Sequence, residues 1–198
     1  MTTLNSGIFN KLNLDNKHTI WITKNPVRFS ANSITFEDIW NLHPEEFHTL
    51  VMHGKEVKTP RWQQAYGKDY RYTGAKNNAL PIIETLYPFL KWSQENIDEG
   101  LNGMLLNWYD GASGHYIGAH RDDTRDLVVG SKIVTISLGE ERTFRLRPLG
   151  LKGYKDYTMR SGEVIVVPWD TNLHWTHEVP SFRKHQGKRI SVTLREFK

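Results

Sequence analysis

The N-terminal half of the chain carries a helical pattern of apolar positions. Over residues 78–99, apolar side chains recur near the helical period, and Asn78 stands where a helix cap is expected. A second helical pattern covers residues 33–52 in two pieces. Thr35 is a candidate cap for the first piece, and Pro44 suits the first turn of the second, followed by two glutamates. The pattern therefore predicts two helical regions in this half.

From Gly103 onward, short alternating segments bounded by Gly, Pro and Asp replace the helical pattern. Helices followed by many short strands indicate an α+β fold. Among such folds we expect a double-stranded β-helix, or jelly roll, with the N-terminal helices packed on one sheet. The strands are predicted at residues 104–109, 115–120, 132–138, 142–147, 163–167 and 189–197.

The length of 198 residues suits one domain, so we expect residues 1–198 to fold as a unit. Within it, residues 1–30 are polar and read as an irregular N-terminal extension, apart from a strand-like stretch at residues 19–22. We expect a monomer.

Composition excludes some classes of site. The chain has no cysteine, which rules out disulfides and cysteine-ligated zinc or iron–sulfur sites. No apolar run approaches the roughly 20 residues of a membrane span, and the first residues lack the regions of a secretory signal. We expect an intracellular protein without a membrane partner, in the cytoplasm or a eukaryotic nucleus. The net charge of +4 and pI of about 9.2 permit a polyanionic partner, although many basic proteins bind no nucleic acid.

A His-x-Asp motif at His120 and Asp122 offers two metal ligands. Residues two apart in a strand point to the same face, so the imidazole and the carboxylate can aim at one point. Two histidines and one carboxylate form the facial triad of non-haem iron(II) oxygenases, which leaves positions open for a cosubstrate and O₂. The third ligand would be His174 or His177, and the motif alone leaves both open.

The segment from Arg189 to Arg195 alternates completely, with Arg, Ser, Thr and Arg on one face and Ile, Val and Leu on the other. One interpretation is an outer strand with its polar face in water. The other is a polar face that lines a cavity, where arginines would bind a dicarboxylate such as 2-oxoglutarate. Asn107 and Tyr109 likewise share a strand face and offer an amide beside a phenol, a common pair on its own.

In their order along the chain, these motifs resemble the motif series of the AlkB family of nucleic-acid dealkylases. The segments Pro60-Arg61-Trp62-Gln63, Tyr66-Gly67 and Thr176-His177-Glu178-Val179-Pro180 are similar as well. The resemblance covers about residues 50–198 and is to the eukaryotic DNA-repair branch and its bacterial relatives.

The resemblance implies an iron site made of His120, Asp122 and His177. It favours His177 over His174, because the family's ligand lies just before a Val-Pro step, as His177 does. It also implies that Arg189 and Tyr109 bind the distal carboxylate of 2-oxoglutarate, while Asn107 and Arg195 serve the end that chelates iron. The full set implied for the cosubstrate is Asn107, Tyr109, Arg189, Thr193 and Arg195.

The resemblance also suggests substrate residues, each with a structural alternative. Tyr72 would stack on a flipped base, or it is a core tyrosine. Asp123 would accept from an exocyclic amine or a phosphate-bound water, or it is a turn residue. Arg61 would hold a phosphate, or it is solvated. Two departures are notable: His53 replaces the aromatic finger of the duplex-repair branch, and Thr124 replaces an acidic residue.

The activity implied is oxidative dealkylation of N-alkylated bases in DNA with Fe(II), 2-oxoglutarate and O₂. The products would be succinate, CO₂, an aldehyde and the repaired base. A 2-oxoglutarate oxygenase acting on RNA or on protein is the main alternative, since the same motifs serve all three substrates. A binding barrel without turnover would need none of these motifs, and zinc hydrolysis would leave the arginine strand unexplained.

Overall fold

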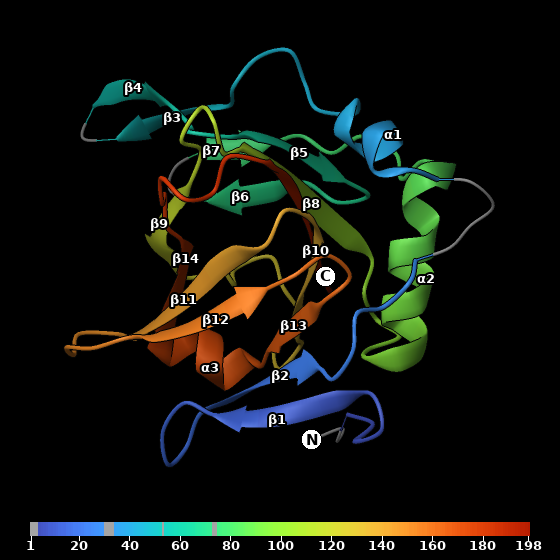
Figure 1. Cartoon of the computed structure of the whole chain (residues 1–198), viewed down its shortest axis with the longest axis vertical. Coiled ribbons are helices and arrows are strands. Elements are labelled where there is room, and N and C mark those ends of the chain that lie inside the picture. The colour runs from blue at the N-terminus through green and yellow to red at the C-terminus, as the bar shows by residue number, and fades with distance from the viewer. Residues whose placement is uncertain (1–3, 30–33, 53, 73–74) are drawn as a thin grey trace.

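The computed structural model describes residues 4–29, 34–52, 54–72 and 75–198, most of which lie in strands and the turns between them (Figure 1). The strands form two large antiparallel sheets in a jelly-roll-like arrangement. The larger sheet has the order β1 (Phe9–Asn13), β2 (Thr19–Thr23), β13 (Val164–Val167), β10 (Ile133–Gly139), β15 (Lys188–Arg195), β8 (Gly103–Asp110), β5 (Trp62–Tyr66). The smaller sheet has the order β12 (Lys155–Met159), β11 (Arg142–Pro148), β14 (Trp175–Val179), β9 (Ile117–His120).

Shorter elements surround these sheets. Two hairpins lie near one end of the molecule in Figure 1, and the helices are few and short. None of the helices that the described residues form is long and apolar enough to cross a membrane. These elements are β3 (Thr49–Met52) with β4 (Lys55–Lys58), β6 (Tyr70–Tyr72) with β7 (Ala75–Asn77), α1 (Phe36–Trp40), the 3₁₀ turn η1 (Glu84–Leu86), α2 (Tyr87–Asn96) and α3 (Trp169–His174).

Three adjacent strands of the larger sheet, β10, β15 and β8, have an apolar core on one face and a polar cavity on the other. Their apolar residues point to a core that also contains Phe89 and Leu90 of α2. Their alternate residues point to a cavity between the sheets. The polar face of residues 189–195 therefore lies in the protein interior, so of the two interpretations the outer strand with this face in water is wrong. The apolar set is Met104, Leu106, Trp108, Val134, Ile136, Ile190, Val192 and Leu194, and the cavity set includes Asn107, Tyr109, Thr135, Ser191, Thr193 and Arg195.

Several predictions for the C-terminal half are confirmed. A strand is present at each of the six predicted positions, with bounds that shift by a few residues. The strands β12 and β14 were not foreseen, because neither carries a clear alternation of apolar and polar residues.

The predictions for the N-terminal half hold only in part. Thr35 caps α1 through a capping box with Asp38, as expected. The second helical piece beginning at Pro44 is wrong, because residues 49–52 pair with β4 in a hairpin that turns at Gly54, where φ is 77°. Within residues 78–99, α2 begins only at Tyr87, so Asn78 is not its cap.

The irregular extension expected for residues 1–30 is also incorrect. Strand β1 pairs with β2, and β2 pairs with β13 at the edge of the larger sheet. The strand-like stretch at residues 19–22 is confirmed as part of β2, whose Ile20 is fully buried. The partner strand β1 was missed because its side chains are mostly polar and exposed.

Replacement of Gly139 by alanine should lower the free energy of unfolding more than the same replacement of Gly130. Both glycines have a φ of 86°, so both variants carry the cost of a left-handed alanine, about 1 kcal/mol. At Gly139 the added Cβ would lie 2.4 Å from the carbonyl oxygen of Lys188, whereas at Gly130 it would meet no described atom within 4 Å. We expect a further loss of about 2 kcal/mol at Gly139, measured by urea unfolding. Equal losses would contradict close packing of the β10–β11 turn against β15.

Candidate metal and cosubstrate site

A cavity of about 410 Å³ lies between the two sheets and gathers most of the residues singled out in the sequence. Strands β9 and β14 of the smaller sheet supply His120 and His177, and the loop that follows β9 supplies Asp122. The larger sheet contributes the polar face of its strands to the opposite wall. The residues that line the cavity include Arg61, Gln63, Tyr70, Tyr72, Asn107, Tyr109, His120, Asp122, Thr135, Phe144, His177, Ser191, Thr193 and Arg195.

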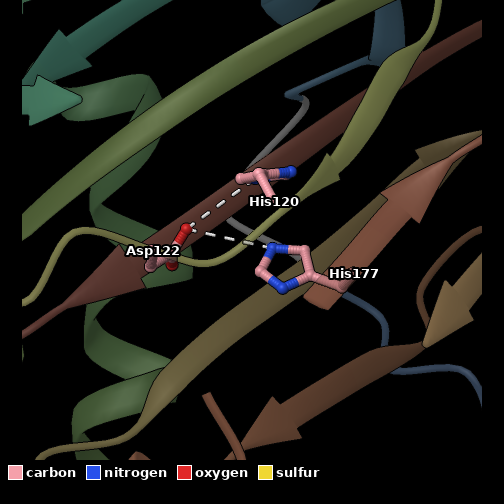
Figure 2. A group of neighbouring side chains, drawn as sticks. All are labelled: His120, Asp122 and His177. Atoms are coloured by element: carbon pink, nitrogen blue, oxygen red, sulfur yellow. Dashed lines mark ion pairs between the residues drawn. The ribbon is translucent and has the colours of Figure 1, made fainter. Parts of the chain in front are cut away.

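His120, Asp122 and His177 converge at one side of this cavity (Figure 2). His177 of β14 is the register partner of His120 of β9, so the two imidazoles come from adjacent strands. Asp122 Oδ1 lies 3.9 Å from Nε2 of His120 and 3.8 Å from Nε2 of His177. Since the three ligand atoms lie within 4.8 Å of one another, the group could hold a metal ion.

The protonation states suit a divalent metal, which needs neutral imidazoles and an ionised carboxylate. Burial lowers the pKa of His177, and it lowers that of His120 to about 3. Nδ1 of His120 lies 2.8 Å from the carbonyl oxygen of Gly118, so Nδ1–H donates to that oxygen and the lone pair of Nε2 is left free for a metal. Burial alone would raise the pKa of Asp122, but the charge and hydrogen bond of Arg195 help to lower it to about 2.

Asp122 is positioned beside the two histidines by other contacts than the shared strand face that was expected. Strand β9 ends at His120, so the two residues do not share a strand face. The backbone of Asp122 is instead clasped by Asn172, which accepts from its N–H at 2.9 Å and donates to its carbonyl at 3.1 Å. The side chain is held by Arg195, whose Nε and Nη2 each lie 2.8 Å from Oδ2, and by the Tyr70 hydroxyl, 3.2 Å from Oδ1.

Arg189 is buried with unused hydrogen-bonding capacity. It is 1% exposed, its Nη2 donates to Ser137 Oγ at 2.8 Å, and its guanidinium lies 5.1 Å from the centre of the Tyr109 ring. Among the described residues, no acceptor reaches its Nε or Nη1. Buried donors without partners are rare and point to a missing ligand. A carboxylate is the kind of acceptor that could bind both of these donors.

Asn107 and Thr193 face the same cavity from neighbouring strands. Thr193 Oγ1 lies 3.3 Å from Oγ1 of Thr135. Asn107 Oδ1 accepts from Arg61 Nε at 2.8 Å, so its amide NH₂ group remains a donor. Arg61 is 6% exposed and also donates to Gln63 Oε1 at 3.1 Å. Arg61 therefore lies in the cavity wall, and the alternative that it is a solvated arginine is wrong.

The remaining candidate residues are spread over different environments. Tyr72 lines the cavity and its hydroxyl is hydrogen-bonded to Gln63. Asp123 is paired with Arg125, two residues on, with Oδ1 and Nε 3.0 Å apart, which fits the turn interpretation. His174 is exposed at the end of α3, with Nδ1 2.8 Å from the Asp170 carbonyl. His53 lies outside the described residues.

Sequence reasoning missed several residues of the cavity and its walls. Tyr70 lies two residues before Tyr72, so the strand period could have placed it beside that residue. Thr135 and Ser137 interrupt an apolar strand with the same period. The contact of Asn172 with Asp122 leaves no signal in the sequence.

A second buried arginine near Arg189 was also missed. Arg142 is 1% exposed and donates to the Gly187 carbonyl at 3.2 Å, and it pairs with Glu140 at 3.4 Å. Burial lowers the pKa of both arginines, and the charge of Arg142 lowers that of Arg189 further. Two arginines are therefore buried in this part of the protein, and one of them is paired with Glu140.

The chain is similar in sequence to proteins of known function. The chain is 29% identical over 154 residues to the DNA oxidative demethylase ALKBH2 of Homo sapiens, with 72% of this chain and 59% of that protein covered. It is 26% identical over 160 residues to the RNA replication protein of Grapevine virus A, with 81% of this chain and 9% of that protein covered. The match thus spans less than two thirds of the length of either relative.

A solved structure, that of OsALKBH1, has the same fold. Its TM-score is 0.57 at 15% identity, over 94% of this chain and 100% of that chain. The profile of the 2OG-Fe(II) oxygenase superfamily matches residues 35–195, which contain every cavity residue described above. The chain therefore belongs to the 2OG-Fe(II) oxygenase superfamily, as an AlkB-like dioxygenase dependent on iron(II) and 2-oxoglutarate.

Proposed function

We propose that this dioxygenase removes alkyl groups from N-alkylated bases in DNA and releases succinate, CO₂ and an aldehyde. The observation that carries the proposal is that one cavity is lined by the candidate metal triad, the polar strand face and the stacked pair Tyr70 and Tyr72. Aromatic stacking is the usual means of holding a base taken out of its strand. The similarity to ALKBH2, a DNA oxidative demethylase, supports DNA as the polymer.

His120, Asp122 and His177 would hold the iron, because they offer three convergent ligand atoms in the required protonation states. When bound, the iron and 2-oxoglutarate supply the oxidation of the alkyl carbon by O₂. The protein's part is to position that carbon and to exclude water. Phe144 would help to exclude water, since its ring is stacked on His177 with the ring centroids 5.4 Å apart.

The cosubstrate would lie between the triad and Arg189. Arg189 has two free donors for the distal carboxylate, with Tyr109 beside it. At the other end, the free NH₂ group of Asn107 would donate to the chelating carboxylate, with Thr193 next to it. Arg195 would serve this end mainly through Asp122, because its Nε and Nη2 are both engaged there.

The substrate base would stack on Tyr72, and Asp123 would accept from its exocyclic amine. Arg61 would act from inside the cavity by orienting Asn107 and Gln63. The net charge of +4 favours approach to a polyanion. We further propose that residues 1–198 work as one intracellular dioxygenase domain and as a monomer.

The proposed substrate is tested by matched N-methylated oligonucleotides of DNA and RNA, single-stranded and duplex, at one stated salt concentration. We expect formaldehyde and succinate to form in equal amounts, with the highest kcat/KM on single-stranded DNA. Flipping a base out of a duplex costs a few kcal/mol that a single strand largely avoids. Highest turnover on RNA, or succinate formation stimulated only by a protein extract, would overturn DNA as the substrate.

His53 bears on the strand preference, since it replaces an aromatic finger and fills less of the gap left by a flipped base. His53→Phe should raise kcat/KM on duplex DNA and leave that on single-stranded DNA unchanged. A duplex preference in the unaltered enzyme would contradict this account of the finger.

The two C-terminal histidines provide a matched test of the metal site. His177→Ala should weaken metal binding by at least about 100-fold, because it removes one of only three protein ligands. His174→Ala should leave it unchanged, since that side chain is exposed and bonded to Asp170. Equilibrium dialysis with Mn²⁺ measures both. Loss of binding in His174→Ala with retention in His177→Ala would reverse the assignment.

Arg189→Lys should raise the KM for 2-oxoglutarate about 10-fold or more, because lysine keeps the charge but loses the planar fork. Mn²⁺ affinity should be preserved, since Arg189 contacts Ser137 and Tyr109. Arg145→Lys is the control, because Arg145 is bound to Asp156 on the smaller sheet. Equal KM values in all three proteins would place Arg189 outside the cosubstrate site.

A further inference from the structure

Two tyrosines of β6 connect the candidate base position with the candidate metal ligand. Tyr70 and Tyr72 lie two residues apart on one face of the strand, with ring centroids 5.7 Å apart and planes tilted by 27°. Both line the cavity, but Tyr70 is the deeper, with only 5% of its surface exposed. A base stacked on Tyr72 would therefore extend an aromatic stack that already includes Tyr70.

Tyr70 also holds one particular oxygen of Asp122. Its hydroxyl donates to Oδ1 at 3.2 Å, while Arg195 occupies Oδ2 and lays its guanidinium 4.3 Å from the centre of the Tyr70 ring. Oδ1 is the oxygen that faces both imidazoles. Tyr70 and Arg195 together turn a single carboxylate oxygen toward the metal position. Hydrogen bonds of this kind orient metal ligands and tune metal affinity.

Tyr72 has a second connection, to the cosubstrate side of the cavity. Its hydroxyl is bonded to Gln63 Nε2, and Gln63 Oε1 accepts from Arg61 at 3.1 Å. Arg61 in turn donates to Asn107 at 2.8 Å. The aromatic pair is thus connected to the candidate metal ligand Asp122 directly and to Asn107 through Gln63 and Arg61.

We propose that Tyr70 is a positioning residue that couples base binding at Tyr72 to metal binding at Asp122. The inference rests on the proposed function, because it takes Tyr72 as the stacking partner of the base. A base that extends the stack restrains the Tyr70 ring, and with it the hydroxyl that orients Oδ1. Coupling between two sites is reciprocal, so a bound base tightens metal binding by the same factor as a bound metal tightens base binding.

The test is a titration with Mn²⁺ in the presence of 2-oxoglutarate, with and without a methylated single-stranded oligonucleotide, followed by electron paramagnetic resonance. Without the oligonucleotide, Tyr70→Phe should weaken Mn²⁺ binding about 10-fold. In the unaltered enzyme the oligonucleotide should tighten Mn²⁺ binding about 5-fold or more, and Tyr70→Phe should abolish most of this gain. Tyr66→Phe is the control, because Tyr66, at the end of β5, is a buried tyrosine of the main core and does not line the cavity.

A second variant separates the two parts of the inference. Tyr72→Leu should bind Mn²⁺ normally without the oligonucleotide but lose the tightening, since Tyr70 keeps its hydrogen bond to Asp122. Unchanged Mn²⁺ affinity in Tyr70→Phe would overturn the positioning role. An undiminished gain in either variant, or no gain in the unaltered enzyme when the oligonucleotide binds, would overturn the coupling. An oligonucleotide that fails to bind in a fluorescence anisotropy assay would instead count against the proposed substrate.

Discussion

The site depends on a buried ion pair between Asp122 and Arg195. Arg195 stands on β15 of the larger sheet, and Asp122 follows β9 of the smaller sheet, so the pair joins the two walls of the cavity. Both side chains are almost fully buried, at 1% and 4% exposure. Removing one partner of such a pair leaves an uncompensated buried charge and costs about 3–5 kcal/mol of folding free energy. The pair also engages one carboxylate oxygen and leaves the other directed at the two histidines.

Around this pair, the larger sheet combines an ordinary apolar core with a polar interior face. One face of β8, β10 and β15 packs in the main core, which supplies the hydrophobic stabilisation. The other face buries hydroxyls, an amide and two arginines, which would be costly without partners. Many of these groups satisfy one another, as Thr135 and Thr193 do. Arg189 retains free donors, and this unsatisfied capacity is what a dicarboxylate would complete.

The sequence predicted the site better than the fold around it. The motif series identified His120, Asp122 and His177, and the structure brings them together. The expectation that His120 and Asp122 share a strand face was wrong. Asp122 is positioned instead by a contact with Asn172, which lies 50 residues further along the chain. The alternation of residues 189–195 was clear, but a strand facing water and a strand facing a polar cavity have the same pattern. Only the tertiary structure distinguishes them.

The N-terminal half shows the limits of local patterns. Pro44 and the glutamates after it are typical of a helix start, yet the residues that follow pair in the β3–β4 hairpin. Strand β1 has mostly exposed side chains, so its place is determined by pairing with β2 and not by its own periodicity. Tyr70 could be placed beside Tyr72 by spacing, but its bond to Asp122 joins residues 52 positions apart. Long-range contacts of this kind leave no local signal.

The most direct test of the account is a crystal structure of the enzyme with Mn²⁺ and 2-oxoglutarate, grown without oxygen. We predict Mn²⁺ bound by His120, Asp122 and His177, with one end of 2-oxoglutarate chelating the metal. The distal carboxylate should accept from Arg189, in the part of the cavity next to Tyr109. A metal bound by other residues, or 2-oxoglutarate bound away from Arg189, would contradict the account.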